Sequence, residues 1–179
     1  MSLHFRSKHP NTRQFWTSAF PKLTVLCHTR SYLWLAAEVS QGPSNDSPQF
    51  APTLMEGALR IALDQVLADA AYDSERHHVF CRELLGIRSL VTPINMRRTR
   101  KWPQGRYRRA LKRRFPRHVY AQRVHVESSF SQDKRQLGSA LSARSDEARA
   151  QEILLRVLVH DLMILERIGW VFYRALLGY

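Results

Sequence analysis

The chain has 179 residues, of which 44% are hydrophobic, and this predicts one globular domain with its own core rather than two domains. Its 28 Lys and Arg residues face only 15 Asp and Glu, so the formal charge of +13 predicts a polyanionic partner, with nucleic acid as the first candidate. We expect no membrane helix, because charged residues interrupt the most apolar stretch, 153–165. The basic N-terminus has no apolar run after it that would make a signal peptide, and Cys27 and Cys81 lack the spacing of a zinc site or a CxxC pair.

The N-terminal half predicts a short arm followed by a hairpin. Residues 1–20 show no apolar periodicity and are expected to form a basic irregular arm. Two apolar, β-rich runs follow, at 22–28 and 32–40, and the short connection between them predicts an antiparallel pair of strands. Ser47 before Pro48 is typical of a helix start, and we expect a helix from there to about Arg60.

The middle of the chain alternates strands with helices. Residues 62–68 read as a buried strand that leads directly into Asp69. Ser74 is expected to cap a helix that Gly86 ends, and 87–94 form a further strand. This alternation indicates an α/β domain on grounds independent of any family. A long amphipathic helix is predicted from residue 146 to 167.

A strongly basic segment follows the last predicted strand. It spans about 95–119, and between residues 97 and 117 it holds 11 Lys or Arg and no acidic residue. Trp102, Tyr107 and Phe115 are interleaved with these charges. Basic side chains neutralise phosphates and rings stack on bases, so we interpret the segment as a DNA-contacting insertion rather than a solvated loop. The residues expected to bind DNA here are Arg108, Arg109, Arg113 and Arg114.

Four residues of the next segment, YAQRVHVESSFSQDKRQ, share one predicted helical stripe: Tyr120, Arg123, Glu127 and Lys134. This order resembles the signature of insertion-sequence DDE transposases. In that family the Glu is the last ligand of an Asp-Asp-Glu metal-binding triad, so the resemblance implies a catalytic, metal-binding Glu127. It also implies that Tyr120, Arg123 and Lys134 hold phosphates of the DNA. The alternative is a solvated helix on which Glu127 merely pairs with Arg123.

A second motif supports the resemblance. The sequence LADAAYDSE is similar to the second-Asp motif of the same transposases, and Asp69 is the position that matches the catalytic aspartate. Asp73 matches the neighbouring residue and is expected to form a cap or turn. Two carboxylates at these positions fit a two-metal site for Mg²⁺ or Mn²⁺, with Asp69 and Glu127 as ligands.

The resemblance implies a ribonuclease H-like mixed sheet flanked by helices, over residues 21–179. One departure is clear, because these transposases carry their first Asp on the first strand, and here no acidic residue precedes Glu38. We therefore expect the first strand to be missing and the chain to be a truncated or decayed transposase without cleavage activity of its own.

Three functions stay open at this point. The first is transposase-type cleavage and transfer of DNA, acting on transposon ends and target, with a homodimer on DNA and a place at the bacterial nucleoid in the cytoplasm as expectations. The second is a non-catalytic DNA-binding remnant. The third, an unrelated basic RNA-binding protein, has no need of Asp69 or of the Tyr-Arg-Glu-Lys stripe.

Overall fold

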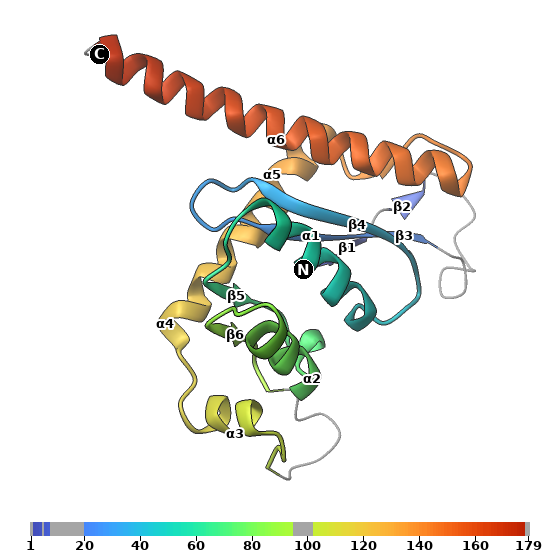
Figure 1. The fold of residues 1–179 in the computed structure, drawn as a ribbon. Coiled ribbons are helices and arrows are strands. Elements are labelled where there is room, and N and C mark those ends of the chain that lie inside the picture. The colour runs from blue at the N-terminus through green and yellow to red at the C-terminus, as the bar shows by residue number, and fades with distance from the viewer. Residues whose placement is uncertain (1, 5, 8–19, 95–101, 178–179) are drawn as a thin grey trace.

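A computed structural model describes residues 2–4, 6–7, 20–94 and 102–177 of the chain. The predicted hairpin is confirmed, with both strands displaced by one or two residues from the expected bounds: β3 (Phe20–Cys27) pairs antiparallel with β4 (Trp34–Gly42). Successive residues of β3 point to opposite faces, so Leu23 and Val25 face one layer of helices while Leu26 faces another. The hairpin is the middle layer of the domain (Figure 1).

The first residues of the chain form two short strands rather than an irregular arm. Strand β1 (Ser2–His4) pairs antiparallel with the edge of β3 that β4 leaves open, and Ser2 lies opposite Thr24. Strand β2 (Arg6–Ser7) pairs parallel with β7 (Ala140–Leu141). The prediction of an irregular arm was therefore wrong for residues 2–4 and 6–7, since backbone pairing along β3 and β7 orders residues whose side-chain pattern is too short to signal a strand. Most of the expected arm, residues 8–19, lies outside the described part of the chain.

Helix α1 (Phe50–Arg60) covers one face of the hairpin. It ends where predicted, but Ser47 does not cap it: Ser47–Gln49 form the 3₁₀ turn η1, and Gln49 is the residue before the helix. Gly57 lets α1 approach β3, because a Cβ on Gly57 would lie 2.2 Å from Leu26 Cδ2.

A parallel strand pair forms the next unit. Strand β5 (Gln65–Leu67) pairs with β6 (Ser89–Val91), and between them run the 3₁₀ turn η2 (Ala70–Tyr72), helix α2 (Glu75–Val79) and the π-helical turn η3 (Phe80–Leu84). The cap at Ser74 is confirmed, because its Oγ accepts the N–H of His77. Gly86 ends the helical segment in the left-handed region at φ 66°.

The C-terminal half is helical. It consists of α3 (Arg106–Arg113), α4 (Arg117–Tyr120), the 3₁₀ turn η4 (Ala121–Arg123), α5 (Val124–Leu137) and α6 (Asp146–Leu177). The helix expected over 120–136 is thus interrupted by η4. The helix predicted from residue 146 continues ten residues beyond the expected end at 167, and its last part projects from the body of the domain (Figure 1).

Two apolar cores hold these layers together. One joins β3 and β4 to α5 and α6 through Leu23, Val25, Trp34, Phe130, Leu141 and Ile153. The other joins α1 to the β5–β6 unit through Phe50, Leu54, Val66, Ala68, Tyr72, Cys81, Ile87 and Leu90. The α/β class predicted from the sequence is confirmed, with the described strands divided among three small sheets.

Buried polar contacts fix α5 and α6 against the hairpin. The Trp34 indole donates to Ser129 Oγ at 3.1 Å, and its ring stacks on His160 with 4.0 Å between centroids. The Trp34 backbone N–H donates to Asp161 at 2.8 Å. Because hydrogen bonds at buried positions are directional, this network sets the rotation of both helices and so the direction of the side chains on their outer faces.

Candidate active site

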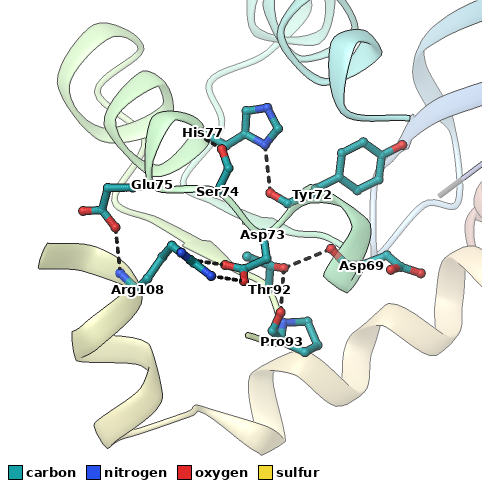
Figure 2. A network of polar contacts seen from close by, with 9 residues as sticks. All are labelled: Asp69, Tyr72, Asp73, Ser74, Glu75, His77, Thr92, Pro93 and Arg108. Carbon is teal, nitrogen blue, oxygen red and sulfur yellow. Dashed lines mark hydrogen bonds and ion pairs between the residues drawn. The ribbon is translucent and has the colours of Figure 1, made fainter. Parts of the chain in front are cut away.

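Asp69 lies at the carboxyl end of β5, where open α/β sheets present functional side chains. Its Oδ1 accepts the N–H of Ala71 at 2.8 Å, which makes it the cap of η2. Its backbone carbonyl accepts the hydroxyl hydrogen of Thr92, just beyond β6, at 2.9 Å (Figure 2). These contacts fix the backbone and one oxygen, and the side chain is still 43% exposed.

Arg123 joins Asp69 to Glu127. One terminal nitrogen of its guanidinium lies 2.7 Å from Glu127 Oε1, and the other lies 3.3 Å from Asp69 Oδ2. Glu127 sits one turn after Arg123, on the first turn of α5, and its side chain is 46% exposed. The structure therefore brings together two carboxylates that are 58 positions apart in the sequence, and a single cation contacts both of them.

Tyr120 borders the same cluster. The Arg123 guanidinium lies 5.9 Å from the centre of its ring, and Phe115 packs edge-on against the ring at 5.3 Å. Burial is the main cause that raises the pKa of the Tyr120 hydroxyl, and the negative charges of Asp69 and Glu127 raise it further, against the opposing effect of Arg123. Tyr120 is thus a neutral phenol within the electrostatic reach of both carboxylates.

Lys134 is more distant from the cluster. It is exposed on α5, two helical turns after Glu127, so it extends the same stripe along the helix surface. In the described part of the chain, the contacts that join Asp69, Arg123 and Glu127 do not include it.

A small cavity opens beside Asp69. It measures about 70 Å³ and lies between β3 and β5, and its wall includes Val25, Leu26, Gln65, Asp69 and Arg123. Beyond Thr24, strand β3 has β4 as its partner on one edge, while β1 pairs only with residues 22–24 on the other. The cavity therefore lies where two strand edges approach each other without pairing in the described residues.

The other acidic residues of the LADAAYDSE motif have a different role. The Arg108 guanidinium binds both oxygens of Asp73, at 2.8 and 2.7 Å, and the Asp73 side chain is fully buried. The Glu75 carboxylate accepts the backbone N–H groups of Tyr107 and Arg108, at 2.8 and 3.1 Å, and so caps the start of α3 from a distance (Figure 2). We call these contacts the α3 clamp.

Gly105 is required by the α3 clamp, because a Cβ at this position would lie 1.9 Å from Glu75 Oε2. Sequence reasoning missed Asp73 and Glu75 as the residues that hold the basic segment, although both lie within the matched motif. It also assigned no helix to the basic insertion, and the structure shows one there, α3.

The α3 clamp holds one of the four predicted DNA-binding residues and leaves the other three exposed. Arg108 is held by Asp73, whereas Arg109, Arg113 and Arg114 are exposed on or just after α3, together with Lys112. The basic residues at 97, 98, 100 and 101 lie outside the described part of the chain. With Arg106 also exposed, this short helix has one anchored arginine and five exposed cations on or just after it, and it can contact several phosphates at once.

The donor set bears on the metal that the resemblance implies. No group of three or more His, Cys, Asp or Glu residues suited to a metal occurs within the described ranges. Asp69 and Glu127 nevertheless share one cation, and Mg²⁺ is commonly bound by one or two carboxylates completed by water and substrate phosphates. The residues therefore fit one divalent ion that takes its other ligands from solvent or DNA.

A family model described as a transposase DDE domain matches residues 2–162. No curated protein and no solved structure matches the chain. Within the described ranges, none of the helices combines the length and the apolar character needed to cross a membrane.

Proposed function

The chain belongs to the transposase DDE domain family, and from this premise we propose that Asp69 and Glu127 are its metal ligands for phosphoryl transfer on DNA. The observation that supports the proposal is the shared contact with Arg123, which places both carboxylates around the same small volume. A divalent ion bound there would activate a water or a 3′-hydroxyl, or stabilise the leaving oxygen. Mg²⁺ and Mn²⁺ both suit a site of oxygen ligands.

Arg123 has two tasks in this proposal. Without metal, its guanidinium offsets the repulsion between the two carboxylates. If a divalent ion engaged the carboxylates, the Arg123 guanidinium would be available to bind a phosphate of the scissile strand, which is the role that the resemblance implies for it. Tyr120 supports the guanidinium through its ring, and Lys134 extends the phosphate path along α5.

DNA binding belongs to the same proposal. The exposed cations of α3 neutralise phosphates whatever the base sequence, so binding is strongly salt-dependent and shows little sequence preference. The α3 clamp holds this helix against α2, and α2 follows Asp69 within the same short segment. Two copies of the chain on one DNA molecule, which the resemblance implies, are part of the proposal as well.

Within the described residues, the cluster around Arg123 contains two carboxylates, those of Asp69 and Glu127. We therefore propose that the chain alone binds DNA but does not cleave it. This combines the first function with the second, the non-catalytic DNA-binding protein. With only two carboxylates, the charge that develops on the phosphate in the transition state is poorly neutralised.

The test supplies a third carboxylate. The chain alone, incubated with supercoiled DNA in Mg²⁺ or Mn²⁺, should leave the DNA intact. A chain extended at its N-terminus by a strand that bears Asp-x-Thr-Gly should gain metal-dependent nicking. That gain should disappear on Glu127→Gln and persist on Asp64→Asn, which alters an exposed ion pair with Arg88 outside the cluster. Nicking by the unextended chain that survives both Asp69→Asn and Glu127→Gln would refute the proposal.

A further inference from the structure

The outer face of α6 carries a row of exposed apolar residues. Leu155, Leu158, Leu162 and Leu165 are 50–61% exposed, and Phe172 is 67% exposed. Leu154 and Val159 flank this row and are 47% and 39% exposed. A soluble domain seldom leaves so many large apolar side chains adjacent to one another unless they meet a partner.

The spacing of the row identifies the shape of the partner. Positions 155, 158, 162, 165, 169 and 172 follow intervals of three and four residues, which is the heptad pattern of a helix that packs along another helix. Gly169 takes the one place in the row without a side chain. We call these six positions the α6 seam.

Among the residues that the structure describes, the body of the domain leaves the α6 seam exposed. Its contacts with α6 come from the opposite face, where Ile153, His160 and Ile164 are buried. Asp161 and Arg156 also point to the body of the domain, since Asp161 accepts the N–H of Trp34 and Arg156 donates to the carbonyls of Gly138 and Ala140. The two faces of α6 are therefore separate, and the seam is left free to pack elsewhere.

The seam is complementary to itself when two copies of α6 run antiparallel. With Leu162 opposite Leu165 of a second copy, Leu155 lies opposite Phe172, and Leu158 lies opposite Gly169. Each pair occurs twice because the arrangement has a two-fold axis, as in most homodimers. A leucine facing a glycine lets the helices approach closely, and no position of the seam is charged.

The apolar area is sufficient for such a pair. Seven large apolar side chains that are about half exposed offer on the order of 100 Å² each, or roughly 700 Å² per chain. A specific interface buries at least about 1,000 Å² over both partners. The projection of α6 from the domain keeps the two bodies apart, and it also separates two chains that each carry a formal charge of +13 (Figure 1).

We propose that two copies of this chain associate through the α6 seam as an antiparallel helix pair. The partner is a second copy, because α6 itself supplies the matching row of residues in the required order. The seam shares no residue with the cluster of Asp69 and Glu127, so the association does not depend on the chemistry proposed there.

Sedimentation velocity of the purified chain without DNA tests the association. We expect a dimer at tens of micromolar protein that Leu162→Glu or Leu165→Lys converts to monomer. Leu59→Glu, which changes an 88% exposed leucine on α1, should leave the dimer intact. Circular dichroism verifies that each variant is folded. A wild-type chain that is monomeric throughout, or a dimer that persists in both seam variants, would overturn the proposal.

Mixing the two monomeric variants, Leu162→Glu and Leu165→Lys, tests the orientation. In the antiparallel register, the glutamate introduced in one variant would face the lysine introduced in the other, and a contact between Leu162 and Leu165 remains on the other side of the axis. The mixture should therefore recover at least half of the dimer signal. In a parallel pair each altered side chain would face a leucine, so a mixture that stays monomeric would overturn the antiparallel arrangement.

Discussion

The segment 69–75 contributes acidic residues to two regions, the α3 clamp and the cluster around Arg123. The charges are paired differently in the two regions. In the α3 clamp, Asp73 is fully buried and holds Arg108 through two short contacts, so each charge has its own partner. At the cluster one turn earlier, Asp69 and Glu127 are each more than two-fifths exposed, and they share Arg123 between them. A matched, buried pair is costly to break, whereas a shared and solvated one can exchange its cation. The difference separates a residue that holds the fold from one that is available for chemistry.

The largest effect is expected on the side of the clamp. Asp73→Ala leaves the Arg108 guanidinium without its main partner in a partly buried place, and it should lower the free energy of unfolding by about 3 kcal/mol. Asp69→Asn should change it by less than about 1 kcal/mol, as is usual for exposed pairs. Urea unfolding of both variants measures the difference. Equal losses in the two would remove the distinction between the regions.

The close approach at Gly105 gives the next largest effect. Gly105→Ala places a methyl group against Glu75 Oε2, and the resulting displacement of α3 should cost about 1–3 kcal/mol. Arg109→Ala is the control, because it introduces alanine at an exposed position of the same helix, away from Glu75. Thermal unfolding compares the two variants. A neutral Gly105→Ala would mean that Glu75 does not cap α3 as described.

The buried ring of His78 makes the free energy of unfolding depend on pH. Burial is the main cause that lowers the pKa of His78 to about 4, and Glu75 and Asp73 oppose this shift while Arg82 and Arg108 add to it. Between about pH 4 and 6.5 the unfolded chain binds this proton and the folded chain does not, so stability is lost as pH falls through that window. The slope from this residue is at most about 1.4 kcal/mol per pH unit.

Urea unfolding at pH 4.5 and at pH 6.5 measures that slope. His78→Gln should reduce it, and His118→Gln, at an exposed histidine of α4, should leave it unchanged. A slope that is the same with and without His78 would show that this ring is not held neutral.

The smallest effect on stability, and the clearest one on binding, is expected on α3. Replacing Arg109, Arg113 and Arg114 by alanine should leave unfolding unchanged, because all three are exposed. It should weaken DNA binding and lower the salt slope by about 0.9 for each phosphate that the variant no longer neutralises. Arg30→Ala, at an exposed position of the β3–β4 turn, is the control. Unaltered binding of the triple variant, measured by fluorescence anisotropy at several salt concentrations, would exclude α3 as the DNA-binding surface.

Features that depend on local sequence could be predicted, whereas features that depend on contacts between distant parts of the chain could not. The hairpin, the Ser74 cap, the Gly86 stop and the strand before Asp69 follow from side-chain pattern and backbone preference, and the structure has them all. Strand β1 was missed because its pairing comes from the edge of β3.

The same distinction applies to the candidate site. The motifs predicted that Asp69, Arg123 and Glu127 are residues of one site, and in the structure Arg123 contacts both carboxylates. The run of basic residues also predicted that Arg108 faces DNA. Nothing in such a run shows which residue meets a distant carboxylate. Only the folded chain places Asp73 against it.

The proposed metal site has Asp69 and Glu127 as ligands, and in the absence of metal the Arg123 guanidinium lies between them. Titration of the chain with Mn²⁺ by isothermal calorimetry measures binding at this site. We expect Asp69→Asn and Glu127→Gln each to weaken binding at least tenfold, Asp64→Asn to leave it unchanged, and Arg123→Gln to tighten it because the competing cation is removed. Binding that is equal in all five proteins, or that Arg123→Gln weakens as much as the removal of a carboxylate does, would contradict the account.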